Sequence, residues 1–562
     1  MDRGLLTALT LNPIPWYMNR ISTDICIVGT GFSGTFIANE LLGTSARVLL
    51  VEKGAHLSRN RIERNHMLWL DLIKASPGSH EDLLQFTRFI YDDAEFEAYS
   101  HVNSGSDVFK YSGHHAVGGN SLLWYGNAVR KMPDDFLTKT RYGFGVDWPI
   151  GYDALEEYYG RAEAEMGVSG PPADVLTPFR TKPFPLPPFA LPPGAIELNG
   201  IFKGSGFELS PSHKARLPVD TADRAACCGA GTCWLFCPAD ARYNCLTTHL
   251  QKLLTAPQVE LRDRLTVSRL VQKGDRIVEA VAFDRQGREI IIEAELFVLA
   301  ANAVENARIL LLSQYHHPDT GFTIRSRAVG KYLTDQVGVW IPLAVPRNLH
   351  GGFEKTIQSC HSLSFYANQP RDRHSSAIIE VFFDAPFAYA GAAKELLTSS
   401  MKEGYYGEDL RNKMLLDALG KVKLCLELEM MAEERNCVTL HQSRKDAHGD
   451  PVAEFRFSIW DQPYLKRSVE HYRTMFQELA EKAGGRAGSI TLRNSFDHML
   501  GTCRMGTDPY DSVVDENLRS HDHGNLYIVG GSAFPTAGAA NPTLTIAALA
   551  LRCGDHIRAL VS

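Results

Sequence analysis

The chain has 562 residues, of which 44% are hydrophobic and 22% are charged, and its formal net charge is −7. This composition is typical of a globular protein, and the length predicts two or more domains because a single core rarely grows to this size. The acidic balance excludes the basic surface that nucleic-acid binding requires. No apolar run reaches the length of a membrane span, and residues 1–20 lack the pattern of a secretory signal.

Residues 24–54 predict a dinucleotide-binding unit. A buried strand at Ile25–Val28 is followed by a helical pattern and by a second buried strand at Val48–Val51. The first turn has the spacing G-x-G-x-x-G, with Gly29, Gly31 and Gly34. These glycines allow a tight turn, the approach of a pyrophosphate and close helix–strand packing, and the helix N-terminus attracts phosphates. Glu52 follows Gly34 by 18 residues, about where an acid would meet a ribose hydroxyl.

The next segments carry less chemistry. The paired glycines at 118–119 indicate close approach to a flat or phosphorylated ligand, with a simple turn as an equal alternative. Residues 147–169 have helical periodicity, and residues 171–193 form a proline-rich, extended connection. Alternating strands fill residues 259–300, with a hairpin turn at Gln286–Gly287. The last of them leads through Ala301 and Asn302 into a helix at Glu305–Leu312.

Residues 331–490 have a different pattern. Strand-like runs at Val337–Ala344 and Val452–Ile459 accompany a long polar helical stretch around residues 391–420. They predict an antiparallel sheet with helices, a common form of substrate-facing domain. Glycine-rich α/β sequence returns from Asp497. The predicted fold class is therefore α/β, with a Rossmann-type domain and an α+β domain built on an antiparallel sheet.

Four of the eleven cysteines lie within eleven residues: Cys227, Cys228, Cys233 and Cys237. An odd total without a signal argues against a disulfide framework. Thiolates suit zinc or an iron–sulfur cluster. Structural zinc sites usually draw on two separated C-x2-C pairs, whereas this compact run ending in Cys-Pro favours an iron–sulfur cluster. A zinc site, a reduced loop and a local disulfide remain the alternatives.

Longer motifs indicate a family. FDHMLGTCRMG (residues 496–506), NLYIVGGSAFPTAGAANPTLTIAALALR (residues 525–552) and VGGNSLLW, with the dinucleotide unit, resemble the glucose–methanol–choline (GMC) family of FAD-dependent oxidoreductases. Residues 142–171 and the cysteine run 227–244 are similar to the catalytic subunit of bacterial FAD-dependent sugar dehydrogenases. The resemblance implies FAD-binding parts at residues 21–155, 246–330 and 491–562. Substrate-domain parts would be 156–225 and 331–490, with the cysteine loop at 226–245.

The resemblance also implies the cofactor contacts. The FAD would contact Gly29, Gly31, Gly34, Glu52, Gly118, Gly119, Asn120, Ser121, Leu122, Val267, Ala301, Gly531, Pro542 and Thr543. Some relatives tether FAD through a histidine in the segment that here reads Ser121–Trp124 and holds none. We therefore expect FAD to be bound non-covalently.

Oxidation of an alcohol needs a base for the hydroxyl proton and an acceptor for the hydride, which flavin N5 supplies. His498 occupies the family's catalytic position in H-x-x-G-T-x-R-M-G, and its ordinary pKa of about 6.5 suits a base. Asn541 occupies the second position, where an amide can hold the substrate oxygen but cannot act as a base. His114 and His115 are weaker candidates, for which a structural role is favoured.

The same relatives carry a three-iron [3Fe-4S] cluster in the cysteine run, and they work with a small subunit and a multihaem cytochrome. The expected activity is thus a sugar or polyol dehydrogenase that passes electrons to a protein acceptor. The missing signal fits either a cytoplasmic enzyme or export with a signal-bearing partner subunit. The alternatives are an oxidase that forms hydrogen peroxide, and a flavin lyase or binding protein without redox turnover.

Overall fold

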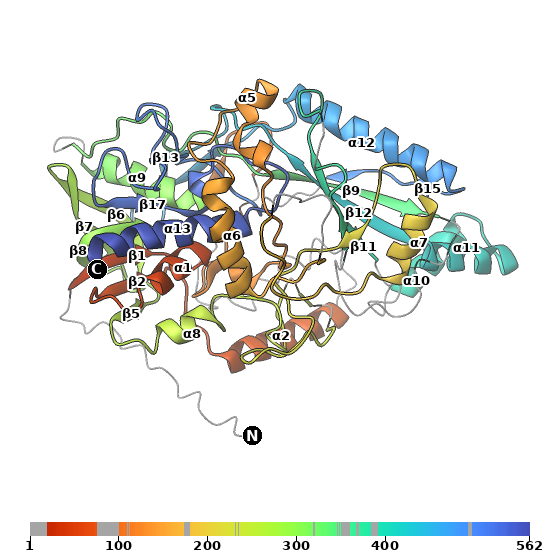
Figure 1. Ribbon diagram of the computed structural model, residues 1–562, viewed down its shortest axis with the longest axis horizontal. Coiled ribbons are helices and arrows are strands. Elements are labelled where there is room, and N and C mark those ends of the chain that lie inside the picture. Colours follow the sequence, from red (N-terminus) through yellow and green to blue (C-terminus); the bar gives the residue numbers. More distant parts are fainter. Residues whose placement is uncertain are drawn as a thin grey trace.

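The computed structural model describes residues 19–562, apart from 76–100, 110, 112, 173–179, 231, 234, 318–320, 346, 348, 350–359, 367–369, 384–391 and 493–496. Two large sheets lie side by side along the long axis of the molecule (Figure 1). The chain passes between them several times, so neither half is a continuous stretch of sequence. None of the helices in the described ranges is long and apolar enough to cross a membrane.

The first is a Rossmann-type sheet with the strand order β5-β2-β1-β8-β7-β6 and with β17 paired to the second half of β8. Its parallel strands are β1 (Arg20–Val28), β2 (Val48–Val51), β5 (Val259–Arg262), β8 (Glu289–Leu299) and β17 (Leu526–Ile528). Its antiparallel strands are β6 (Thr266–Lys273) and β7 (Arg276–Phe283). The packed helices are α1 (Phe32–Glu40), α6 (Asp153–Met166), α9 (Ala303–His316) and α13 (Thr543–Val561), and α13 contacts both α1 and α6 (Figure 1).

Local sequence explains much of this sheet. All four residues of β2 are buried, as are the last four of β1, because helices and neighbouring strands cover both faces. The predicted hairpin is confirmed: Gly287 N donates to Asp284 O at 3.0 Å between β7 and β8. The helix predicted after Ala301 begins at Ala303, where the Asn302 side chain accepts hydrogen bonds from the N–H groups of Val304 and Glu305.

The second is an antiparallel sheet with the order β15-β9-β12-β11-β10-β4, and β16 pairs with β9. Its strands are β4 (Ser210–Pro211), β9 (Gln336–Ala344), β10 (Cys360–Ser362), β11 (Ala377–Phe382), β12 (Lys421–Glu429), β15 (Arg486–Ala487) and β16 (Thr491–Leu492). The helices α7 (Pro193–Ile201) and α12 (Pro463–Lys482) pack in its apolar core. The predicted α+β arrangement is confirmed, and the helical stretch around 391–420 forms α10 (Ala392–Lys402) and α11 (Gly407–Leu419).

One predicted strand lies elsewhere. The run from Val452 forms β14 (Pro451–Arg456), which ends three residues before the predicted boundary at Ile459. It joins β13 (Cys437–Lys445) and β3 (His101–Asn103) in a separate three-stranded sheet. The other helices are α2 (Arg59–Ala75), α5 (Thr138–Tyr142), α8 (His249–Leu253) and the 3₁₀ turns η1 (Gly119–Leu122), η2 (Pro133–Phe136) and η3 (Gly530–Ala533).

Candidate active site

The glycine motif forms a turn that larger residues could not occupy. Gly29 has φ +108°, and a Cβ there would lie 2.6 Å from Ala300 O, so the turn passes directly over the end of β8. A Cβ on Gly34 would lie 2.0 Å from Gly29 O, because α1 begins in contact with the preceding turn. Gly31 differs: a Cβ there would meet nothing within 4 Å in the described chain. The motif is thus closed on two sides and open at its middle glycine.

The open side of Gly31 is where a phosphate would lie. Gly31 is the N-cap residue of α1. It has no side chain that could accept hydrogen bonds from the first N–H groups of the helix, so these groups can serve a ligand. The paired glycines reach the same place, since a Cβ on Gly119 would lie 3.3 Å from Gly31 Cα. Gly118 N donates to Thr30 Oγ1 at 3.1 Å. Two glycine loops distant in sequence therefore form one cradle whose free N–H groups and open space fit a dinucleotide pyrophosphate.

Glu52 joins these loops. Its Oε2 accepts from Thr30 Oγ1 at 2.8 Å and from Thr30 N at 3.1 Å, and its Oε1 accepts from Gly54 N at 2.9 Å. Burial raises the pKa of the Glu52 carboxyl, and these hydrogen bonds oppose that rise. Val267 lies close by on β6, two residues after Leu265, whose N–H donates to Glu52 O. The ribose contact of Glu52 and the adenine contact of Val267 remain predictions.

The turn after the paired glycines is held by its own side chains. Asn120 Oδ1 accepts from His114 N at 2.9 Å, and Ser121 Oγ donates to Gly118 O at 2.6 Å and accepts from Cys245 N at 2.9 Å. The Leu122 carbonyl accepts from Arg242 Nη2 at 2.9 Å. His115 lies 3.5 Å from the Tyr111 hydroxyl. The structural role expected for both histidines stays a prediction.

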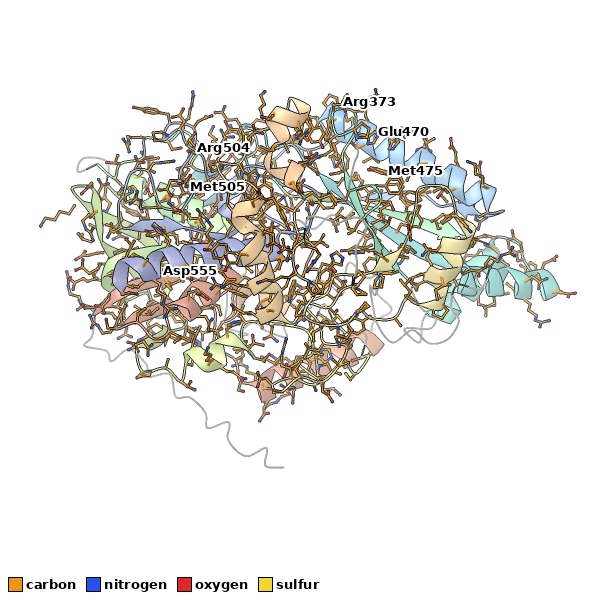
Figure 2. All side chains as sticks on the ribbon, in the orientation of Figure 1. Arg373, Glu470, Met475, Arg504, Met505 and Asp555 are labelled. Atoms are coloured by element: carbon orange, nitrogen blue, oxygen red, sulfur yellow. The ribbon has the colours of Figure 1, made fainter. Side chains whose placement is uncertain are left out.

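The C-terminal motifs complete the cradle. A Cβ on Gly531 would lie 2.6 Å from Met499 O, and Gly501 N donates to Gly531 O, so the segment after His498 packs on Gly531. Ala301 N donates to Asn306 Oδ1 beside the end of β8. Pro542 and Thr543 begin α13. Arg504 and Met505 of the 496–506 motif lie in the half of the molecule that holds the Rossmann-type sheet, whereas Glu470 and Met475 lie on α12 in the other half (Figure 2).

The segments that carry the two catalytic candidates both contact the beginning of β9. His498 N donates to Asp335 Oδ2 at 3.1 Å. Gln336, the next residue, donates through Nε2 to Gly538 O at 2.8 Å and to Ala540 O at 2.7 Å, immediately before Asn541. Asn541 is 5% exposed, and its Oδ1 has no hydrogen-bond partner in the described part of the chain. A buried amide oxygen in this state is suited to accept a hydrogen bond from a ligand.

One face of the antiparallel sheet is polar although it is buried. The apolar residues of β9, β11 and β12 point into the core with α12. The alternate residues form the opposite face, where register pairs align Trp340, Cys425, Glu380 and His361 across four strands. This face turns toward the C-terminal segment, because Ile378 on it packs with Ala539 and Ala540.

Charged side chains cover this face. Lys214 Nζ donates to Asn127 Oδ1, and Asn127 Nδ2 donates to Glu380 Oε1. Burial lowers the pKa of Lys214 to about 8, although Glu380 opposes the shift. Sequence analysis did not single out these residues. The sequence of the neighbouring strand β12, KVKLCLELE, contains a sign of this polar face. Charged and apolar residues alternate along it, although most of the strand is buried.

The four clustered cysteines differ in their exposure to solvent. Cys228 is exposed, Cys233 and Cys237 are buried, Cys227 is half-buried, and all four are free thiols. Arg216 Nη1 donates to Cys233 Sγ at 3.3 Å, and Cys227 packs in one small cluster with Cys237. Burial raises the pKa of the Cys227 thiol, and Arg216 opposes this rise. Across the residues described here, no three His, Cys, Asp or Glu side chains converge as a metal site requires. The donor set thus suits a cluster, but its arrangement does not form one.

Comparison with known proteins identifies the class. Models of the GMC oxidoreductase family match residues 213–338 and 432–550. The chain is 28% identical to the fructose dehydrogenase large subunit of Gluconobacter japonicus, over 96% of this chain and 98% of that protein. It is 26% identical to 2-methyl-1,2-propanediol dehydrogenase of Mycolicibacterium austroafricanum, over 95% of both chains. It is also 26% identical to paromamine 6'-oxidase of Streptomyces fradiae, over 95% of this chain and 91% of that one.

Solved structures agree on the fold. Pyridoxine 4-oxidase from Mesorbium loti superposes with a TM-score of 0.63 at 19% identity, over 95% of this chain and 99% of that chain. The fold combines a Rossmann-type sheet that carries the glycine cradle with an antiparallel sheet. The chain is similar to the GMC oxidoreductase family over these two segments, residues 213–338 and 432–550, and it is an FAD-dependent oxidoreductase that acts on CH–OH groups.

Proposed function

We propose that the protein is a dehydrogenase that oxidises an alcohol group of a sugar, glycoside or polyol to a carbonyl. The carrying observation is that the segments that carry His498 and Asn541 contact two consecutive residues, Asp335 and Gln336, where the antiparallel sheet reaches the C-terminal segment. The names of the relatives, a fructose dehydrogenase, a propanediol dehydrogenase and a paromamine oxidase, favour a polyhydroxylated substrate.

In this proposal the substrate C–H and O–H bonds break together or in sequence. His498 takes the hydroxyl proton as general base, and Asn541 orients the substrate oxygen by hydrogen bonding. The carbon's hydrogen leaves with its electron pair, and bound FAD supplies the acceptor at N5. The glycine cradle at Gly29, Gly31, Gly34, Gly118 and Gly119 would hold the FAD, without a covalent bond from Ser121–Trp124. Acid precipitation should then release FAD into the supernatant.

The polar face of the antiparallel sheet supports the substrate class. This face has hydrogen-bond donors and acceptors on Glu380, Asn127 and Lys214. They can replace the hydrogen bonds among themselves with hydrogen bonds to substrate hydroxyl groups. Trp340 and Phe382 pack with ring centroids 4.8 Å apart on the same face, and their tilted rings add apolar surface beside these polar groups. A few polar groups among apolar ones are typical of small-molecule sites.

An anaerobic screen of sugars, glycosides and polyols for flavin bleaching tests the activity. His498→Ala should lower kcat about 10²- to 10⁴-fold, because general base catalysis contributes this much, while FAD content stays unchanged. His471→Ala is the matched control, since His471 is exposed on α12 and stacks on His374. Absence of bleaching by every compound, or full activity of His498→Ala, would reject the proposal.

We also propose that electrons leave to a protein acceptor through an iron–sulfur cluster bound by Cys227, Cys233 and Cys237. Support comes from the shared environment of these thiols and from the exposure of Cys228. In the described residues the three thiols are too far from a common point to hold a metal. The cysteine loop would therefore have to change its conformation to bind a [3Fe-4S] cluster. A small subunit and a cytochrome-type acceptor would then be its partners.

Metal analysis decides this second proposal. After anaerobic purification, iron and acid-labile sulfide should reach about three and four per chain, Cys233→Ser should lose them, and Cys228→Ser should keep them. The oxidase alternative rests on the paromamine 6'-oxidase likeness, and it predicts iron-free protein and one hydrogen peroxide per substrate oxidised. Iron below about a tenth of the protein concentration would exclude the cluster.

A further inference from the structure

Gln336 is a fully buried amide that holds the turn before Asn541. Its Nε2 donates to Gly538 O at 2.8 Å and to Ala540 O at 2.7 Å, and the residue is 0% exposed. Both partners are carbonyl oxygens, which only accept, so the amide nitrogen must face them. The Gln336 Oε1 consequently points away from the turn, and it has no hydrogen-bond partner among the described residues.

The same turn is held from the flavin domain. Trp148 Nε1 donates to Thr536 Oγ1 at 2.8 Å, and Lys131 Nζ donates to Ala537 O. Gly538 has φ +63°, and a Cβ there would lie 2.7 Å from Lys131 Nζ, so the lysine packs directly against the turn. Side chains from both domains therefore fix the five residues that precede Asn541.

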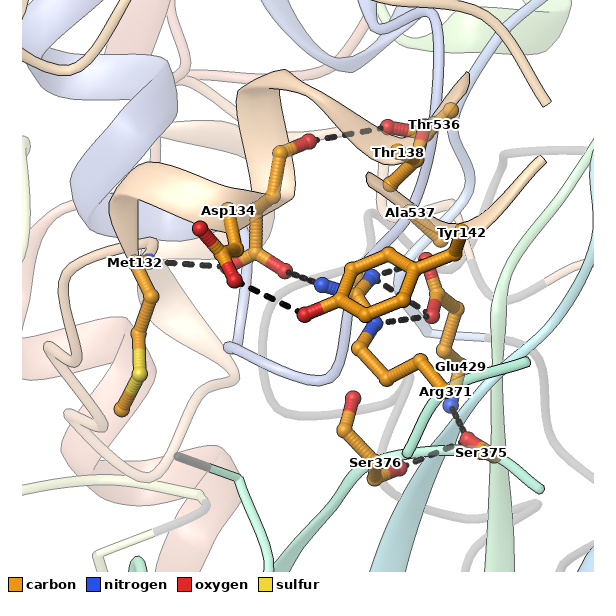
Figure 3. Close-up of polar contacts among 12 residues, drawn as sticks. Met132, Asp134, Thr138, Tyr142, Arg371, Ser375, Ser376, Glu429, Thr536 and Ala537 are labelled. Atoms are coloured by element: carbon orange, nitrogen blue, oxygen red, sulfur yellow. Dashed lines mark hydrogen bonds and ion pairs between the residues drawn. The ribbon is translucent and has the colours of Figure 1, made fainter. Parts of the chain in front are cut away.

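A buried network of ion pairs around Arg371 connects the contacts of Gln336 with those of Lys131 (Figure 3). Arg371 donates through Nη1 to Asp135 Oδ1 at 2.9 Å and through Nη2 to Glu429 at 2.7 Å, and all three side chains are at most 3% exposed. Glu429 is the register partner of Gln336 on the neighbouring strand. The network thus ties the strand that carries Gln336 to the segment that carries Lys131.

The residue before Gln336 holds the other catalytic segment. Asp335 Oδ2 accepts from His498 N at 3.1 Å, and Asp335 is 0% exposed. Two consecutive residues at the beginning of β9 therefore contact the two segments that carry His498 and Asn541. Gln336 is the first residue of β9 and pairs with Glu429 of β12, and Asp335 directly precedes it.

We propose that Gln336 is a positioning residue for Asn541, and that with Asp335 it sets the spacing between His498 and Asn541. This inference rests on the proposed oxidation of an alcohol. Removal of the amide leaves the carbonyls of Gly538 and Ala540 without their donor, so the turn relaxes and Asn541 moves. A displacement of about 1 Å at a positioned group can cost about 10²-fold in rate.

Gln336→Met tests the proposal, because methionine keeps the length of the side chain and removes the donor. Gln462→Met is the matched control: Gln462 is 1% exposed and donates through Nε2 to Met431 O at 3.0 Å, away from the turn. Gln336→Met should lower kcat at least 10-fold with KM changed less than 3-fold. The double variant with Asn541→Ala should be within 2-fold of Asn541→Ala alone. Gln462→Met should leave kcat within 2-fold.

Hydrogen exchange gives a readout that does not depend on activity. Amides of residues 536–541 should exchange at least 10-fold faster in Gln336→Met and at the wild-type rate in Gln462→Met. If wild-type flavin is not reduced by any alcohol, the proposed function fails, while the exchange still decides the positioning role. The inference would be overturned if amides 536–541 of Gln336→Met exchange at the wild-type rate. It would also be overturned if the loss of kcat in the double variant equals the sum of the losses in Gln336→Met and Asn541→Ala. Should Gln336→Met not fold, Gln336→Asn replaces it, with the same criteria.

Discussion

The glycine cradle allows folding and cofactor binding to be separated with two substitutions of one kind. Gly31 and Gly34 lie three residues apart in the same motif, yet their surroundings are opposite. Gly31→Ala places a methyl group in open space at φ −71°, which alanine adopts without strain. Gly34→Ala places it 2.0 Å from Gly29 O, well inside van der Waals contact.

The magnitudes follow from these distances. For the FAD-free protein, Gly31→Ala should raise the free energy of unfolding by about 0.4–1 kcal/mol, because alanine restricts the unfolded chain. Gly34→Ala should lower it by about 1–3 kcal/mol or more, since the backbone must shift. For FAD, the methyl group of Gly31→Ala would lie where the pyrophosphate approaches. The loss of one charge-assisted hydrogen bond there, about 1.5–3 kcal/mol, corresponds to roughly 10- to 150-fold in Kd.

Urea unfolding of the FAD-free proteins gives the stabilities, and titration of FAD fluorescence gives Kd. Holo wild-type protein should also melt above holo Gly31→Ala, because bound ligand stabilises the native state by mass action. The reasoning fails if Gly31→Ala binds FAD as tightly as wild type. It fails equally if Gly31→Ala destabilises the FAD-free protein as much as Gly34→Ala does.

Two further predictions concern buried charge. Arg371→Met should lower the free energy of unfolding in urea by about 3–5 kcal/mol, because it leaves the carboxylates of Asp135 and Glu429 buried without their cation. The control Arg473→Met breaks an exposed ion pair and should lower it by under about 1 kcal/mol. Equal losses in the two variants would contradict this reasoning. Burial lowers the pKa of His523 to about 4, so between pH 6.5 and 4 the unfolded chain binds more protons at this site, and acid favours unfolding. His523→Gln should therefore lose less stability over that pH range, by up to about 3 kcal/mol, and parallel pH profiles would contradict the assignment.

Some features could be predicted from sequence because their cause is local. The strands β1 and β2 follow from apolar runs without alternation, and the turn between β1 and α1 follows from glycine spacing. The hairpin at Gly287 likewise depends on residues within a few positions of each other, whereas the helix expected from Glu305 begins two residues earlier, at Ala303, where Asn302 caps it. The catalytic candidate His498 came from a motif that resembles a known family.

Sequence alone therefore determined the class of fold, the dinucleotide cradle and the candidate pair His498 and Asn541. Only the tertiary structure decided that β14 joins a separate sheet, that one sheet face is both buried and polar, and that Asp335 and Gln336 connect the catalytic segments. The hydrogen bonds of Gln336 to Gly538 and of His498 to Asp335 span 202 and 163 residues of sequence. Periodicity and spacing report only contacts between near neighbours, so no local pattern could contain these bonds.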